Sequence, residues 1–317
     1  MRVLVTGGSG FVGRSVCEQI ESGKGIDVFP VVRSPDKAGS KCIVVPDIGP
    51  ETAWQEFLRG TDLIIHTAAR VHDMKDTSAD PLAAYRHINV AGTMNLARQA
   101  ADAGVRRFIF LSSIKVNGDN TTSGRPFRAD DQANPADAYG RSKYEAELGL
   151  QQLSQVSGMD VVVIRPPLVY GPGVRANFLT MMRWVHKGWP VPLGNVDNCR
   201  SLVALDNLVD LIKTCCVHPA AANQVFLVSD GEDVSITELL RRIGAALQRP
   251  ARFLPVPTGL VRALAACTGK HGQVARLAGS LQVDIDKTRK HLDWSPVVSM
   301  EAALQETARH YLDSLRR

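Results

Sequence analysis

The chain has 317 residues, which is enough for one large domain or two closely joined ones with a full hydrophobic core. Its 44% hydrophobic and 22% charged residues are typical of a soluble globular protein. The net charge of +5 is small and the basic residues form no run, so we expect no nucleic-acid partner. The six cysteines form no C-x-x-C pair and no metal-ligand spacing with histidine, which predicts reduced thiols, no bound metal and a cytoplasmic location.

The sequence also argues against insertion into a membrane. No apolar run is long enough to span a bilayer. Met1 and Arg2 lead directly into a predicted strand, so we expect no signal peptide. The stretch 257–269 comes closest to a membrane-surface helix, but its short length and single Arg262 favour a core or lid helix.

Strand and helix patterns alternate along the first half. Continuous apolar runs predict the strands of a parallel sheet that is covered on both faces, and helical periodicity fills the intervals. This order predicts an α/β fold with a doubly wound parallel Rossmann sheet. The strands are expected at 2–6, 27–32, 42–46, 62–68, 107–113 and 160–166, and the helices near 11–22, 51–59, 81–104 and 136–157.

After Pro166 the elements become shorter and less regular. We expect a dinucleotide-binding domain over 1–166 and a smaller, mostly helical substrate-binding part over 167–317, with some segments interleaved and a cleft between the two. The helices of this second part are expected near 176–187, 206–217, 235–248, 258–267 and 300–315, with a strand at 224–229.

A glycine-rich turn connects the first strand to the first helix. In the stretch VLVTGGSGFVG, Gly8, Gly10 and Gly13 fit G-x-G-x-x-G, and Gly7 extends the pattern to G-x-x-G-x-x-G. Glycine permits a tight turn, close packing of helix on strand, and bare amides that face a pyrophosphate at the helix N-terminus. The turn therefore predicts a dinucleotide site.

Three residues of the first half form a candidate catalytic set. Ser113 lies at the carboxyl end of the fifth predicted strand, where ligands bind in such sheets. Tyr139 and Lys143 come later on one helix face, one turn apart. A phenol titrates near pH 10, and a neighbouring ammonium stabilises its phenolate, so the pair predicts acid–base chemistry with Ser113 holding the reacting oxygen.

These motifs, together with HTAA at 66–69, Asn89 in NVAGTMNLA and RPPLVYGPG, resemble the extended short-chain dehydrogenase/reductase family, in its nucleotide-sugar epimerase/dehydratase branch. The resemblance covers nearly the whole chain and implies a homodimer that associates through the helices at 81–104 and 136–157. It implies that Asn89 supports local architecture. The implied cofactor contacts are Gly7, Gly10, Phe11, Val12, Gly13, Asp47, Ile48, Ala68, Ala69, Tyr139, Lys143 and Pro166.

The same resemblance implies a UDP-sugar substrate. Asn177, Phe178 and Arg200 match the nucleotide-diphosphate contacts of the family, and a guanidinium suits a diphosphate. The alternative for Arg200 is a surface ion pair with Asp197 or Asp206. A second arginine that the family often supplies is displaced here, because the aligned position falls near Val274, with Arg276 close by.

The cofactor prediction depends on Arg33. An acid at the end of the second strand holds the ribose 2′-hydroxyl of NAD, whereas this chain has Arg33 there, which complements the 2′-phosphate of NADP. NADP(H) is therefore favoured. NAD(H) remains open if Arg33 stacks on the adenine.

The two residues after Ser113 narrow the choice of reaction. The dehydratases of the branch carry an Asp-Glu pair there, and this chain has Ile114 and Lys115, so reaction at C4 alone is expected. The favoured reading is reduction of a UDP-4-keto-6-deoxy-N-acetylhexosamine, as in the bacterial O-antigen (lipopolysaccharide) subgroup that the chain resembles. The alternatives are a UDP-hexose or UDP-N-acetylhexosamine 4-epimerase and a non-catalytic NADP sensor. Lys115 is predicted either to contact the substrate or to point to solvent.

Overall fold

The structure is a computed structural model that describes residues 1–21, 25–34, 41–71, 80–122, 124–191, 198–254 and 279–316. The helix expected near 258–267 and the region of Val274 and Arg276 lie outside the described residues. Among the described residues, no helix is both long and apolar enough to cross a membrane.

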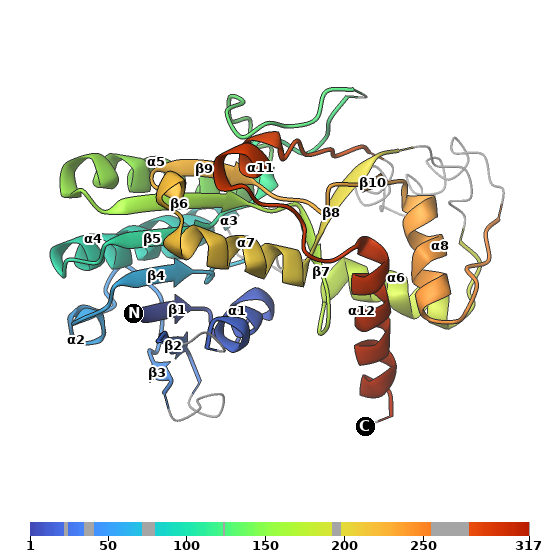
Figure 1. Ribbon diagram of the computed structural model, residues 1–317, viewed down its shortest axis with the longest axis horizontal. Coiled ribbons are helices and arrows are strands. Elements are labelled where there is room, and N and C mark those ends of the chain that lie inside the picture. The colour runs from blue at the N-terminus through green and yellow to red at the C-terminus, as the bar shows by residue number, and fades with distance from the viewer. Residues whose placement is uncertain are drawn as a thin grey trace.

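A seven-stranded sheet forms the centre of the molecule (Figure 1), and its six strand pairs are all parallel. The order β3-β2-β1-β4-β5-β6-β9 reverses direction between β1 and β4, which is the switch point where such sheets bind ligands. The doubly wound Rossmann sheet is thus confirmed. Its strands are β1 (Arg2–Thr6), β2 (Asp27–Val32), β3 (Ile43–Val44), β4 (Leu63–His66), β5 (Arg107–Leu111), β6 (Asp160–Arg165) and β9 (Gln224–Leu227).

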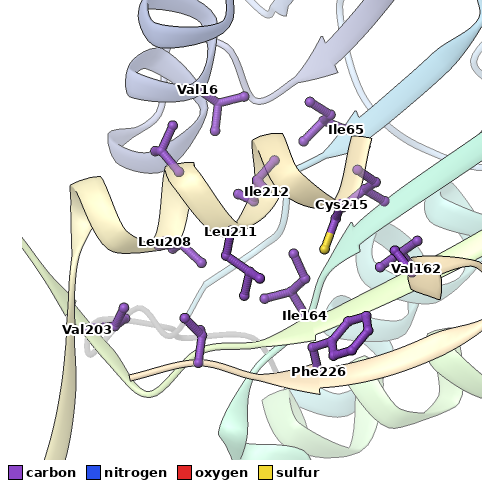
Figure 2. Close-up of a cluster of buried hydrophobic side chains, with 14 of the residues drawn as sticks. Val16, Ile65, Val162, Ile164, Val203, Leu208, Leu211, Ile212, Cys215 and Phe226 are labelled. Atoms are coloured by element: carbon purple, nitrogen blue, oxygen red, sulfur yellow. The ribbon is translucent and has the colours of Figure 1, made fainter. Parts of the chain in front are cut away.

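Helices cover both faces of this sheet. Strand residues alternate between two buried clusters, because successive side chains point to opposite faces. Ile64, Phe108 and Phe110 face α4 (Thr93–Asp102) and α5 (Ala138–Ser157). On the other face, α1 (Phe11–Glu21) packs against α7 (Leu205–Val217), and both close over Ile65, Val162 and Ile164 (Figure 2).

Two helices of the first half differ from their predicted form. The expected helix at 81–104 consists of α3 (Pro81–Tyr85), a π-helical piece η2 (Arg86–Gly92) and α4. The expected helix at 51–59 is reduced to α2 (Gln55–Leu58), because side chains of α4 bind the backbone before it. Asn95 and Gln99 donate to the Thr52 carbonyl at 2.8 and 3.0 Å, and Gln99 accepts from the Trp54 amide.

The rest of the chain forms a second layer around a three-stranded sheet, ordered β10-β8-β7. The strands β7 (Leu168–Tyr170), β8 (Arg200–Ala204) and β10 (Asp233–Val234), and the helix α11 (Asp286–Leu292), were not predicted; these elements are short and depend on partners far away in sequence. The helices α6 (Ala176–His186), α8 (Ile236–Ala246) and α12 (Met300–Ser314) lie near the predicted positions and share one apolar cluster.

Several elements from beyond residue 166 belong to the first layer, among them α11, which packs against β9. Helix α7 covers the main sheet and β9 extends it beside β6, so the chain returns to the first layer after building β7 and β8 (Figures 1 and 2). Short helical turns at η3 (Ile114–Val116) and η4 (Pro219–Ala221) complete the described elements. The division into domains near residue 166 stays a prediction.

Candidate active site

The residues singled out from the sequence gather at the carboxyl edge of the main sheet. The glycine turn follows β1, Arg33 follows β2, and Ala68 and Ala69 follow β4. Ser113 follows β5 and Pro166 follows β6. Backbone bonds fix the last two segments to each other, because the Ser112 amide donates to the Ile164 carbonyl and the Ile114 amide donates to the Pro166 carbonyl.

The glycine turn brings α1 into close contact with β1 and β4. A Cβ on Gly13 would lie 2.2 Å from the Gly7 carbonyl oxygen, and one on Gly7 would lie 2.8 Å from Thr67 Oγ1. Gly7 also has a φ of +72°, which side chains disfavour. The first helical hydrogen bond runs from the Arg14 amide to the Gly10 carbonyl, so the amides of Phe11 and Val12 precede it. This helix N-terminus fits the pyrophosphate of a dinucleotide.

The predicted adenosine contacts border a cavity beside β3. Asp47 and Gly49 line a cavity of about 450 Å³ together with Val45, Phe57 and His87. Asp47 is exposed and its Oδ1 accepts from the Ile48 amide at 2.7 Å, while Ile48 itself is buried. Arg33 is exposed at the end of β2, where its sequence position predicted it. The roles of Asp47 and Arg33 toward a cofactor stay predictions.

Ser113 and Tyr139 are brought together. Ser113 is in extended conformation at the start of η3, and its Oγ accepts from the Lys115 amide at 3.2 Å. Tyr139 lies in the first turn of α5, which Asp137 caps by accepting from the Gly140 amide at 2.7 Å. A hydrogen bond joins the side chains of Ser113 and Tyr139. Burial raises the pKa of the Tyr139 phenol, Asp137 adds to the rise, and the bond to Ser113 opposes it.

Lys143 lies one turn later on α5 and is 1% exposed. Its Nζ donates to the Leu111 carbonyl oxygen at 2.8 Å and sits 4.4 Å from the centre of the Phe110 ring. Burial lowers the pKa of this ammonium to about 7, and the carboxylate of Glu147 opposes the fall. Lys143 can therefore lose its proton near neutral pH. It lies one helical turn after Tyr139 on α5.

A buried ionic network beneath Lys143 escaped the sequence reasoning. Glu147 and Arg165 have side chains that are 1% and 6% exposed, and the guanidinium binds both carboxylate oxygens. Ser112 donates to Glu147, and Arg165 donates to Asn117 Oδ1 at 3.0 Å. Glu147 follows Lys143 by four residues, so the helical spacing that linked Tyr139 to Lys143 would also have indicated it.

Two further buried polar residues support the loops around the site. Asn89, on the π-helical piece, accepts from the Arg70 amide at 2.8 Å and donates to Ser142 Oγ at 3.0 Å, which ties the loop after β4 to α5. This agrees with the architectural role expected for it. His66 is held between Thr6 and Thr93 at 2.8 and 3.0 Å, and burial lowers its pKa to about 3.

Lys115 is neither a free side chain nor a solvent-directed one. Its ammonium lies between the carboxylates of Asp119 and Asp137, with Asp137 Oδ2 at 3.4 Å, and its side chain is 27% exposed. Because Asp137 also caps α5, this triad connects η3 to the first turn of the helix that carries Tyr139. A contact between Lys115 and substrate stays a prediction.

The other predicted substrate contacts lie on the second layer. Asn177 is exposed at the start of α6. Phe178 is 0% exposed and stacks on Tyr170 at 5.3 Å, so only its backbone is available to a ligand. Arg200 begins β8 and donates to the Gly279 carbonyl at 2.8 Å, and burial lowers its pKa. Asp206 accepts instead from Gln19, and Asp197 lies outside the described residues.

The arrangement is suited to transfer of a proton at an alcohol or carbonyl oxygen. Ser113 and Tyr139 offer two hydroxyls that share a hydrogen bond, and Lys143 places a positive charge one turn away. The helix N-terminus after β1 lies at the same sheet edge, where a dinucleotide fits.

Comparison with known proteins agrees with this geometry. The profile of the NAD dependent epimerase/dehydratase family matches residues 3–229. A UDP-glucose 4-epimerase of Vibrio cholerae is 47% identical over 317 residues, covering 99% of this chain and 97% of the relative. An N-acetyl-alpha-D-glucosaminyl-diphospho-ditrans,octacis-undecaprenol 4-epimerase of Escherichia coli O157:H7 is 27% identical over 267 residues, covering 82% of this chain and 77% of that protein.

Solved structures share the fold. The UDP-glucuronic acid 4-epimerase of Bacillus cereus in complex with NAD superposes with a TM-score of 0.79 at 20% identity, covering 100% of both chains. RMD of Pseudomonas aeruginosa, complexed with NADPH, superposes with a TM-score of 0.76 at 20% identity, covering 98% of this chain and 99% of the other. By its sequence profile and its relatives, this chain belongs to the NAD-dependent epimerase/dehydratase family and is an enzyme of the nucleotide-sugar epimerase/dehydratase type.

Proposed function

We propose that the protein is a 4-epimerase of a UDP-hexose or UDP-N-acetylhexosamine. The observation that carries the proposal is the Ser113–Tyr139–Lys143 arrangement, which supports redox chemistry at one carbon. Ile114 comes directly after Ser113 and is 4% exposed, so no acid stands beside the site at the position where dehydratases of this type have one. The 47% identical relative bears the name of a UDP-glucose 4-epimerase, and a second relative also bears the name of a 4-epimerase. This favours the epimerase over the reductase that the sequence alone favoured.

The residues of the site have complementary tasks in this reaction. A bound nicotinamide cofactor supplies the hydride acceptor and then the hydride donor. Tyr139 accepts the proton of the C4 hydroxyl as the C4–H hydride leaves, and it returns that proton to the oxygen when hydride is added to the opposite face of the keto-sugar. Ser113 donates a hydrogen bond to the same oxygen. Proton and hydride are both restored, so the net reaction is inversion at C4.

Lys143 helps the Tyr139 phenol to form the phenolate that accepts the substrate proton. Burial and Asp137 both raise the pKa of Tyr139, which opposes formation of its phenolate. The Lys143 ammonium offsets this while it is protonated, and Glu147 favours that protonated form. With a pKa of about 7, Lys143 loses its proton as the pH rises through neutrality, so the support for the phenolate falls above that pH in the free enzyme.

The cofactor is proposed to be NADP(H), on the strength of Arg33. An exposed guanidinium at the end of β2 complements a 2′-phosphate and has nothing to accept from a 2′-hydroxyl. A charge-assisted bond contributes about 1.5–3 kcal/mol, so we expect NADP(H) to bind about tenfold or more tightly than NAD(H). Calorimetry with both cofactors tests this, and Arg33→Ala should remove the difference. Equal affinities in the unaltered enzyme would show that NAD(H) serves equally well.

Reduction of a UDP-4-keto-6-deoxy-N-acetylhexosamine is the second candidate, and Arg33 favours it. A site for NADP(H) suits a reductase, because a reductase takes its hydride from free NADPH and releases NADP⁺ after each turnover. The same Tyr139 would then donate its proton once to the C4 oxygen. This activity would place the enzyme in bacterial lipopolysaccharide synthesis.

Product analysis separates the two candidates. An epimerase should equilibrate UDP-GlcNAc with UDP-GalNAc, or UDP-glucose with UDP-galactose, without consuming cofactor. A reductase should oxidise one NADPH for each 4-keto sugar and should leave the four UDP-sugars unchanged. Tyr139→Phe is the control in both assays, since it should lower either activity about a hundredfold or more. Absence of both activities in the unaltered protein would contradict an enzymatic role on these substrates.

The assembly is proposed to be a homodimer that associates through the surface of α3, α4 and α5. These helices pack against one another on one face of the main sheet, and α5 carries the exposed Leu148 and Val156 at 40% and 84% exposure. Light scattering after gel filtration tests this. Leu148→Glu should shift the mass to that of one chain, and Leu168→Glu, which alters an equally exposed leucine on β7, should not.

A further inference from the structure

We propose that the end of the molecule formed by α6 and α8 binds the surface of a membrane that contains anionic phospholipids. The interaction is peripheral and needs no spanning segment. It goes beyond the reaction at C4 and does not depend on which sugar the enzyme takes. Four observations support it: the distribution of charge, the joining of two segments, an exposed aromatic pair and the position of the surface relative to the site.

Charge is strongly segregated along the chain. Residues 161–196 and 239–283 together hold 11 of the 37 Lys and Arg residues and none of the 32 Asp and Glu residues. Outside these two stretches acids outnumber bases. Arg165 is buried in its pair with Glu147, but exposed cations remain on α6 and on the described segment after α8, where neither stretch has an acid. A basic region of this kind attracts anionic surfaces at a distance.

The structure brings α6, from the first stretch, and α8, most of which belongs to the second, into one surface. Helices α6 and α8 pack against each other at the end of the molecule away from the N-terminus (Figure 1). Beyond α6, Val191 pairs with Phe253: its amide donates to the Arg252 carbonyl at 2.8 Å, and its carbonyl accepts from the Leu254 amide at 2.9 Å. The segment after α6 therefore lies alongside the segment after α8.

The basic side chains of this surface differ in their partners. Arg241 and Arg242 pair with acids at or before the start of α8. Lys187 and Arg252 are exposed, and within the described ranges neither has a carboxylate at ion-pair distance. Lys187 instead lies 4.6 Å from the centre of the Trp189 ring. These two cations are available to phosphate groups outside the protein.

Large apolar side chains accompany these cations. Trp184 and Trp189 contact each other edge to face at 5.2 Å and remain 40% and 47% exposed, and Leu254 is 46% exposed. The Trp184 indole donates to the Pro190 carbonyl at 3.2 Å, which fixes the turn after α6. Indole rings next to Lys and Arg are the groups that settle at the boundary between headgroups and acyl chains. A partner that is only polyanionic would offer no apolar contact to Trp184, Trp189 and Leu254, whereas a phospholipid membrane offers both phosphate groups and an apolar layer.

The surface lies next to the predicted substrate site without belonging to it. Asn177 is near the first residue of α6 and Trp184 near its last turn, so about 11 Å of helix separates them. Docking through the far end of α6 would hold the enzyme at a membrane while the sheet edge with Tyr139 stays accessible to a water-soluble sugar.

Vesicle binding by the full chain tests the proposal. The protein should sediment with phosphatidylcholine vesicles that contain phosphatidylglycerol, and binding should weaken as salt is raised. Of the four tryptophans, Trp54 and Trp294 are 0% and 4% exposed, so a blue shift of the emission on binding would report Trp184 and Trp189. Lys187→Glu with Arg252→Glu should weaken vesicle binding by about tenfold or more, with the C4 activity unchanged.

Arg106→Glu is the matched control, because Arg106 is an exposed cation just before β5, at the opposite edge of the sheet. It should bind vesicles as the unaltered protein does. The proposal is overturned if the unaltered protein does not bind anionic vesicles, if the Lys187/Arg252 variant binds them equally well, or if the tryptophan emission does not move. Preferential binding of duplex DNA, competed away from the vesicles, would also overturn it in favour of a nucleic-acid partner.

Discussion

The two lysines beside the Ser113–Tyr139 pair occupy opposite environments. Lys143 is 1% exposed and faces a carbonyl oxygen and an aromatic ring, so burial lowers its pKa to about 7. Lys115 is partly exposed and lies between two carboxylates. Removal of an ammonium from water favours loss of its proton, and at Lys143 this effect outweighs the opposing carboxylate of Glu147. The comparison assigns support of proton transfer to Lys143 and a structural ion-pair role to Lys115.

Removal of the Tyr139 hydroxyl should have the largest effect on activity. Tyr139→Phe keeps the ring that contacts Tyr85 edge to face at 5.9 Å, so the fold and cofactor binding should survive. General acid–base catalysis contributes about a hundredfold to ten-thousandfold, and the turnover number should fall within that range. Single-turnover kinetics measure it. A variant that kept more than half of the rate would show that another group transfers the proton.

The support beneath Lys143 should be the next most sensitive part. Glu147→Gln removes the carboxylate from a buried pair and leaves the Arg165 guanidinium without its counterion. Breaking such a pair costs about 3–5 kcal/mol of unfolding free energy. Urea denaturation measures the loss. Glu145→Gln on the same helix is the matched control, because its bond to Arg86 is exposed and should matter far less. Similar stability of both variants would contradict a structural role for the buried pair.

His66 should make the protein sensitive to acid. Its folded pKa is about 3, below its ordinary value near 6.5, because burial excludes the charged ring. Between these two pH values the unfolded chain binds a proton at His66 and the folded chain does not, so the free energy of unfolding falls as pH is lowered through this window. His66→Gln should reduce that fall relative to the unaltered protein.

Denaturation at several pH values between 3 and 7 measures the slope for both proteins. His291→Gln is the control for replacing a histidine at an exposed position, since His291 is exposed on α11. Identical slopes for the unaltered protein and the His66 variant would mean that other groups account for the acid sensitivity.

The sequence predicted those parts of the molecule that local patterns determine. Continuous apolar runs identified the first six strands of the main sheet, and the G-x-G-x-x-G turn and the Tyr139–Lys143 spacing placed residues at one sheet edge. Strand β9 was expected at 224–229, but its place beside β6 depends on packing of α7 over the sheet, which no local pattern encodes.

Other features depend on contacts between distant residues. The strands β7, β8 and β10 have two to five residues each and form only as a group, with Asp230 accepting from Tyr170 at 2.8 Å and from the Ala204 amide at 2.7 Å. Arg165 became recognisable as the partner of Glu147 only once α5 lay across β6. The sequence of the π-helical piece around Asn89 shows no hydrophobic periodicity that would distinguish it from an α-helix.

The smallest effect is expected at Lys115, and it decides between two roles for that residue. Lys115→Met removes one member of a partly exposed triad, and such pairs contribute about 0–1 kcal/mol, so the variant should fold and its turnover should change less than about tenfold. Asp137, left without its counterion, should raise the pKa of Tyr139 further, so turnover should fall slightly while the KM for the UDP-sugar stays constant.

Steady-state kinetics over a range of pH separate these outcomes. Lys115→Arg is the control, since it keeps the positive charge between Asp119 and Asp137 and should restore the turnover number. A rise in KM with an unchanged turnover number would mean that Lys115 binds the sugar nucleotide directly. Lys115 would then leave its ion pairs with Asp119 and Asp137 when substrate binds. In that case Lys115 would serve substrate binding and Lys143 would serve proton transfer.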